Sequence, residues 1–130
     1  MTIAYWCVLI SMFMPIVWTG FAKAGGVRSD AGRYDNTAPR DYLNRLQGWP
    51  ARANWAQQNA LEAFPPFAAG VIIAHQVGNL AQGTIDLLAV IFVVARLVYG
   101  FLYMADLSTL RSLVWFVGLV STVLLFVLSV

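Results

Sequence analysis

Two ionisable residues interrupt or border stretches of the chain that are otherwise apolar. Glu62 borders the charge-free interval 63–85, and Arg96 is the single charge in the run 87–105. A charged group near the middle of a bilayer costs about 2.5–3.5 kcal/mol on insertion scales, so it needs a partner or a water-filled cavity. The opposite charges predict either an interhelical pair that fixes packing or a polar pocket suited to a small zwitterion or anion.

Other polar residues share helical faces with these two. At 100° per residue, Arg52 and Asn59 fall on the same third of a helix as Glu62. In a second helix, the spacing from Arg96 places two tyrosines on its face, three and seven residues later. The sequence therefore predicts a pocket between helices that is lined by Arg52, Asn59, Glu62, Arg96, Tyr99, Tyr103 and Arg111.

The face that carries Glu62 changes character after two prolines. Pro66 has no N–H, so it removes the helical hydrogen bond to the carbonyl of Glu62 and leaves that acceptor free. Gly70, Ala74 and Gly78 continue the face at four-residue intervals. Small residues at this spacing allow close helix contact in a membrane, so the face is predicted to pack against other helices.

The composition indicates what must position these residues. Sixty percent of the chain is hydrophobic and 11% is charged, with a mean hydropathy of +0.71, whereas soluble domains carry about 25% charged residues. Residues 1–22, 63–85 and 112–130 are free of charge, and each approaches the roughly 20 residues that cross a bilayer. Together with 87–105, they predict an all-α fold, an integral membrane four-helix bundle that forms a single domain over residues 1–130.

Turn and cap signals give the expected helix bounds. We expect a first helix over 2–21, a polar loop over about 23–50, and a second helix that starts at Gly48-Trp49-Pro50, where proline suits a first turn. The third is expected over 85–107. The fourth begins at Ser108, which is predicted to cap it. Small residues in "AKAGG" at 22–26 also fit a cleaved signal, but no basic segment precedes the apolar run, which favours a retained helix.

The distribution of basic residues predicts the threading. The turn at 78–84 has none, whereas six of the eight Lys and Arg residues lie in or at the edge of the long loop: Lys23, Arg28, Arg33, Arg40, Arg45 and Arg52. The positive-inside rule therefore places the loop at 23–50 on the cytoplasmic side, and an even number of spans puts both termini outside. Acidic residues alternate with the arginines, which favours a solvated loop that faces headgroups over a nucleic-acid site.

The remaining reactive residue types carry weaker signals. Cys7 is alone and lies within the first apolar run, which is typical of packing. His75, the single histidine, is predicted to contact a headgroup or a turn, and Trp115 is predicted to be packing. Because no H-x-x-x-H or C-x-x-C pattern occurs, the sequence predicts no metal site.

Three motifs together resemble a known family. The string "NALEAFPPF" at 59–67 precedes "ARLVYGFLY" at 95–103 and "LRS" at 110–112. In this order on the second, third and fourth helices, they are similar to the MAPEG family, the membrane-associated proteins in eicosanoid and glutathione metabolism. The resemblance is to a bacterial-type member, which implies the bacterial plasma membrane, and it covers the chain from about Arg52 to the end.

The resemblance implies a ligand and an assembly. Family members are similar in forming homotrimers of four-helix subunits that bind glutathione between neighbours near the cytoplasmic side. It implies a glutathione-dependent transferase or peroxidase that takes a hydrophobic electrophile from the surrounding lipid. Arg111 and Tyr103 would then be catalytic, and the residues that bind the tripeptide would be Arg52, Asn59, Glu62, Arg96 and Tyr99.

One position departs from the family pattern. Eicosanoid and transferase members are similar in having an arginine four residues before the asparagine, where this chain has Trp55. An alternative interpretation is therefore a non-catalytic membrane protein that keeps the fold as a binding or assembly module. A small-solute channel is a third, less favoured reading, because no second ring of ionisable residues follows a path across the membrane.

Overall fold

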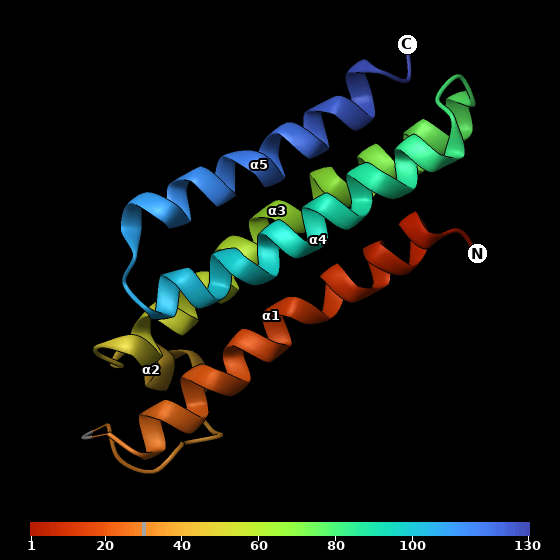
Figure 1. Ribbon diagram of the computed structural model, residues 1–130. Helices are drawn as coiled ribbons and strands as arrows, with labels where there is room; N and C mark the ends of the chain where they lie inside the picture. The colour runs from red at the N-terminus through yellow and green to blue at the C-terminus, as the bar shows by residue number, and fades with distance from the viewer. Residues whose placement is uncertain (30) are drawn as a thin grey trace.

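The computed structural model describes residues 1–29 and 31–130, and every regular element in those ranges is a helix. Figure 1 shows the long helices running alongside one another, with one short helix at the end of the bundle. Four are long and apolar enough to cross a membrane, which confirms the predicted all-α membrane bundle. The helices are α1 (Ile3–Val27), α2 (Pro39–Asn44), α3 (Trp49–Val77), α4 (Gln82–Met104) and α5 (Ser108–Val127).

Both termini lie at one end of the bundle, together with the turn between α3 and α4 (Figure 1). The opposite end carries α2 and the connection between α4 and α5. This is the arrangement that an even number of spans requires. The side of the membrane that each end faces stays a prediction from the basic residues.

Several predicted boundaries were wrong. The first helix continues past Phe21 to Val27, so the polar connection is shorter than residues 23–50. The third span covers Gln82–Met104 in place of 85–107. Ser108 does not cap α5, because the N-cap is Leu107 and no side chain bonds there. The last turns of α1 are held by their glycines, because Gly25 lies directly against Trp49 and Gly26 lies directly against Tyr42 and Leu46.

The connection between α1 and α3 contains a helix that the sequence did not predict. Pro39 occupies the first position of α2, and Tyr42 anchors the helix because its side chain is buried. The Tyr42 hydroxyl donates to the carbonyl of Gly32 at 3.0 Å. Tyr42 forms a small cluster with Leu46 and with alanines of α1 and α3. Helix α2 is therefore held against the ends of α1 and α3.

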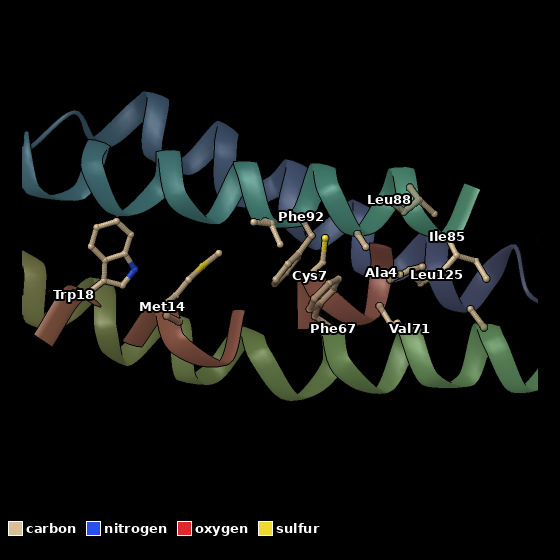
Figure 2. Close-up of a cluster of buried hydrophobic side chains, with 14 of the residues drawn as sticks. Ala4, Cys7, Met14, Trp18, Phe67, Val71, Ile85, Leu88, Phe92 and Leu125 are labelled. Carbon is tan, nitrogen blue, oxygen red and sulfur yellow. The ribbon is translucent and has the colours of Figure 1, made fainter. Parts of the chain in front are cut away.

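The main core lies between α1, α3, α4 and α5. Figure 2 shows Phe67 and Phe92 in the middle of this cluster, and their rings stack with centroids 3.8 Å apart. Trp18 of α1 packs directly on Gly100 of α4, where a Cβ would overlap the indole ring. A larger residue at position 100 would separate these helices, so the glycine sets the distance between α1 and α4.

Two of the three small residues predicted on the α3 face pack against other helices, whereas Gly78 is exposed and has no atom within 4 Å of an added Cβ. A Cβ at Gly70 would lie 2.9 Å from a ring carbon of Phe126 and 3.3 Å from the Leu125 Cβ, both on α5. Ala74 is fully buried. Gly78 ends α3 with φ +74°, the left-handed conformation that glycine adopts without strain. The face thus brings α5 close to α3.

His75 joins the first turn of α1 to α3. Its Nε2 lies 3.2 Å from Thr2 Oγ1, its Nδ1 lies 2.7 Å from the Val71 carbonyl oxygen, and its ring stacks on Tyr5 at 4.3 Å. Asp86 of α4 accepts a hydrogen bond from the Ala4 N–H at 2.8 Å. The predicted headgroup or turn contact of His75 is therefore replaced by a contact between helices.

Candidate functional site

Arg96 is the buried centre of the polar residues between the helices. Its side chain is 3% exposed, and its guanidinium lies 4.3 Å over the ring of Tyr99, one turn further along α4. Its Nη2 donates to Asn59 Oδ1 of α3 at 2.6 Å. A cation over an aromatic face and a charge-assisted hydrogen bond both favour the charged state of a guanidinium away from water.

Glu62 reaches Arg96 through an intermediate residue. Asn59 Nδ2 donates to Glu62 Oε2 at 3.2 Å, while the oxygen of the same amide accepts from Arg96. Among the described residues Glu62 and Arg96 therefore meet through Asn59. Of the two predicted alternatives, the direct interhelical pair is not formed. The physical reason is that an amide carries a donor and an acceptor, so Asn59 can bond the carboxylate and the guanidinium at once.

Aromatic rings extend this arrangement toward the start of α5. Tyr99 and Tyr103 meet edge to face at 5.5 Å, and the Arg111 guanidinium lies 4.3 Å over the Tyr103 ring. Trp55 of α3 lies against the same tyrosine at 6.2 Å. The residues so connected form what we call the polar line: Glu62, Asn59, Arg96, Tyr99, Tyr103 and Arg111.

Arg52 is the one predicted site residue that stands apart from this line. Its Nε donates to the carbonyl of Met104 at 3.1 Å. Met104 is the last residue of α4, where carbonyl groups lack helical partners. Arg52 thus satisfies the end of α4 and holds it against the beginning of α3.

Two cavities lie along the polar line. The Glu62 cavity, of ≈ 190 Å³, is lined by Glu62, Asn59 and Arg96 on its polar side and by Pro66, Phe92 and Leu119 on its apolar side. The Arg111 cavity, of ≈ 410 Å³, is lined by Tyr99, Arg111, Ser112, Trp115 and Phe116. Each cavity has both polar and apolar side chains in its lining. Each can therefore bind a polar group and an apolar group of a ligand side by side.

Trp115 lines both cavities, and sequence reasoning assigned it only to packing. A signal was present, because Trp115 lies four residues after Arg111 and so shares its helical face. Gly118 and Thr122 continue that face and also line the Glu62 cavity. This face of α5 was not recognised in the sequence because no charged residue follows Arg111 on it.

The chemistry of the site follows from its groups. The polar line holds two guanidinium groups, one carboxylate, one amide and two phenols. Guanidinium groups bind carboxylates in a bidentate manner and stabilise nearby anions, and a phenol can donate to an anion that forms beside it. This set fits an amphoteric ligand whose anionic ends face arginines and whose cationic end faces Glu62.

The family comparison decides the membership of the chain. The model of the MAPEG family matches residues 3–130, which is nearly the whole length. The chain belongs to the MAPEG family. The match includes α1 and α2 and so extends further than the motifs from Arg52 onward. Comparison with curated proteins and with solved structures gave no match.

Proposed function

We propose that this MAPEG-family chain is a glutathione-dependent membrane enzyme, a transferase or peroxidase that acts on hydrophobic electrophiles. The observation that carries the proposal is the polar line, which connects a carboxylate and two guanidinium groups beside two cavities. A structural ion pair would need only Glu62 and Arg96. It would not explain the third charge, Arg111, which lines a cavity of its own and lies over the Tyr103 ring.

The charges of the polar line match those of the tripeptide. Glutathione has two carboxylates, one ammonium group and a thiol. Arg111 can take a carboxylate, and Glu62 can neutralise the ammonium group, while the Asn59 amide contributes a further hydrogen bond. Arg96 is bonded to Asn59 and stacked on Tyr99, so we assign it the role of positioning these two side chains.

The reactive group would be the glutathione thiol, which supplies the nucleophile as its thiolate. Arg111 provides positive charge that lowers a thiol pKa, and the Tyr103 hydroxyl provides a hydrogen bond to the sulfur anion. The contact of the Arg111 guanidinium with the Tyr103 ring supports a shared role for these two residues. The protein then forms no covalent bond itself.

The hydrophobic substrate is proposed to come from the bilayer. Phe92, Pro66 and Leu119 give the Glu62 cavity an apolar wall beside its polar residues. An electrophile dissolved in lipid can reach such a wall without crossing water. Trp115 lines both this cavity and the Arg111 cavity, so the electrophilic carbon or peroxide oxygen of the substrate would lie toward the thiolate at Arg111 while its apolar remainder stays among these side chains.

The assembly is proposed to be a homotrimer. The Glu62 side chain is exposed in a single chain although it borders an apolar stretch of α3. Lipid does not solvate a carboxylate, so another surface must cover it. A neighbouring subunit would cover it and complete the site, and the number three follows from the family resemblance.

Glutathione binding by the detergent-purified protein tests the proposal. Titration calorimetry and a thiolate absorbance difference spectrum should both saturate at the same glutathione concentration. A folded, assembled protein without saturable binding at millimolar glutathione would leave the non-catalytic alternative, a binding or assembly module with the family fold.

A further inference from the structure

Prolines interrupt α1 and α3 at about the same depth of the bundle. Pro15 lies inside α1, and Pro65 and Pro66 lie inside α3. The Tyr5 ring of α1 stacks on the His75 ring of α3, which fixes the register of the two helices at this point. Pro15 is ten residues after Tyr5, and Pro65 is ten residues before His75. The two interruptions therefore lie at one level of the membrane.

The prolines weaken both helices at this level. A proline has no N–H, so it cannot bond the carbonyl four residues earlier. In α3 the consecutive prolines remove two such bonds in succession. In α1, Ser11 Oγ donates to the Cys7 carbonyl and Thr19 Oγ1 donates to the Pro15 carbonyl, both at 2.8 Å. Hydroxyl bonds of this kind bend helices. Bending is therefore easier in α1 and α3 than in α4 and α5, whose sequences contain no proline.

Both helices are fixed to α4 next to their prolines. Phe67 directly follows the prolines of α3, and its ring stacks on Phe92 of α4 with centroids 3.8 Å apart (Figure 2). Trp18, one turn after the proline of α1, packs directly on Gly100 of α4. These two contacts lie close to the level of the prolines, so a bend at that level would move them least. They are suited to be pivots.

The halves of α1 and α3 that adjoin α2 form one body with it. Gly25 of α1 lies directly against the Trp49 ring of α3, and Gly26 lies directly against Tyr42 of α2. Contacts this close make the three helices move together. We call this body the α2 unit, which consists of α2, residues 16–27 of α1 and residues 49–64 of α3.

The Glu62 cavity lies between the α2 unit and the helices α4 and α5. Asn59 and Glu62 line it from the α2 unit, Arg96 lines it from α4, and Pro66 lines it from the interruption itself. The hydrogen bond from Arg96 to Asn59 closes one side. The cavity has a volume of ≈ 190 Å³, whereas sites for small ligands usually measure about 300–1,000 Å³. It must therefore widen to accept a ligand of that size.

We propose that the α2 unit swings as one body about a hinge formed by Pro15, Pro65 and Pro66, and that this movement widens the Glu62 cavity. The end of the bundle that carries both termini stays in place, because His75 bonds the first turn of α1 and Asp86 bonds the Ala4 N–H. A molecule dissolved in the bilayer then enters from the side. Its identity as an electrophile rests on the proposed function, whereas the movement does not.

A cysteine in the cavity wall reports the movement. Thr122 is 6% exposed and lines the Glu62 cavity. In a Cys7→Ala background, Thr122→Cys should therefore react with a lipid-soluble maleimide only while the cavity is widened. Val94→Cys is the reference, because Val94 is 53% exposed and its reaction needs no opening. In wild-type helices the reaction at position 122 should be slower than at position 94 but measurable.

Removal of the prolines tests the hinge. Pro15→Ala and the double change Pro65→Ala/Pro66→Ala should each slow labelling at position 122 about tenfold, because restored helical hydrogen bonds oppose the opening. Each is expected to act alone, since the two helices bend together. Pro39→Ala is the matched control, because Pro39 is the first residue of α2, where no helical hydrogen bond is lost. Labelling at position 94 should stay the same in every variant.

Hydrogen exchange of the wild-type protein gives a second measurement that needs no substitution. The amides of residues 16–18 and 67–69 bond carbonyls on the other side of the prolines, so a hinge opens them first. They should exchange faster than amides in the middle of α4 and α5. Exchange at equal rates in all four helices would contradict the hinge even where a proline variant fails to fold.

Several labelling results would overturn the proposal. Equal rates at positions 122 and 94 would mean that the cavity is open without any movement. Equal rates at position 122 in wild type and in the proline variants would remove the hinge, and equal slowing by Pro39→Ala would assign the effect to general stability. Slowing by Pro15→Ala alone would remove the joint movement. Expected labelling rates in a protein that binds no glutathione would support the hinge and contradict only the enzyme proposal.

Discussion

At the scale of single residues, Asn59 has the most connections in the polar line. It bonds Arg96 with its oxygen and Glu62 with its nitrogen. The two charges are thereby compensated without touching, and a carboxylate oxygen of Glu62 stays open to a ligand. A direct ion pair with Arg96 would have occupied the carboxylate oxygens of Glu62. The connection through the Asn59 amide leaves one of these oxygens available to bind a ligand.

The first prediction concerns this coupling. Glu62→Gln and Arg96→Met should show an interaction energy of about 0.5–3 kcal/mol in a double-mutant cycle, because the two charges share one hydrogen-bonded network. Repeating the cycle in an Asn59→Ala background should bring that energy close to zero. Unfolding in detergent measures both cycles. Additive effects in the wild-type background would show that the charges act independently.

The second prediction separates the two proposed catalytic residues. Arg111→Ala should weaken both glutathione affinity and thiolate formation, because one guanidinium supplies the carboxylate contact and the positive charge. Tyr103→Phe keeps the ring under Arg111 and should change affinity only a few-fold while raising the pKa of the bound thiol. Calorimetry and the pH dependence of thiolate absorbance measure these quantities. Arg33→Ala is the control, and a passive binding module would show neither effect.

At the scale of elements, close contact between α3 and α5 depends on one glycine. Gly70→Leu should destabilise the protein by about 1–3 kcal/mol, because its side chain would have to displace Phe126 and Leu125 of α5. Gly20→Ala is the matched control, since no atom lies within 4 Å of the added carbon. Thermal unfolding in detergent compares the two. A Gly70→Leu protein as stable as wild type would mean that α5 is free to move away.

The elements also show where sequence reasoning succeeds. The four spans and the shared face of Arg96, Tyr99 and Tyr103 were predictable, because both depend on periodicity within one segment. Helix α2 was not, since its six residues are held by Tyr42 contacts with distant parts of the chain. Asn59 was predicted as a ligand contact, but its intermediate position required the geometry of both helices.

At the scale of the whole molecule, the threading can be tested directly. Both termini and the α3–α4 turn lie at one end, and α2 lies at the other (Figure 1). The basic residues predict that α2 faces the cytoplasm. Reporter fusions after residue 36 should therefore be active as cytoplasmic reporters, and fusions at the C-terminus as external ones. A reversed pattern would contradict the positive-inside assignment, and reporters on one side would contradict four spans.

The last prediction is that a neighbouring copy covers Glu62. A carboxylate in an apolar face is costly in contact with lipid, whereas exposed valines such as Val94 are suited to lipid. In a Cys7→Ala background, Glu62→Cys should therefore react more slowly with a lipid-soluble maleimide in membranes than Val94→Cys does. Light scattering of the purified protein should give the mass of three chains of 14.3 kDa each. If Glu62→Cys and Val94→Cys react at equal rates and the purified protein has the mass of one chain, the assembly is excluded. If the rates are equal but the protein is a trimer, the interface lies on another face of the bundle.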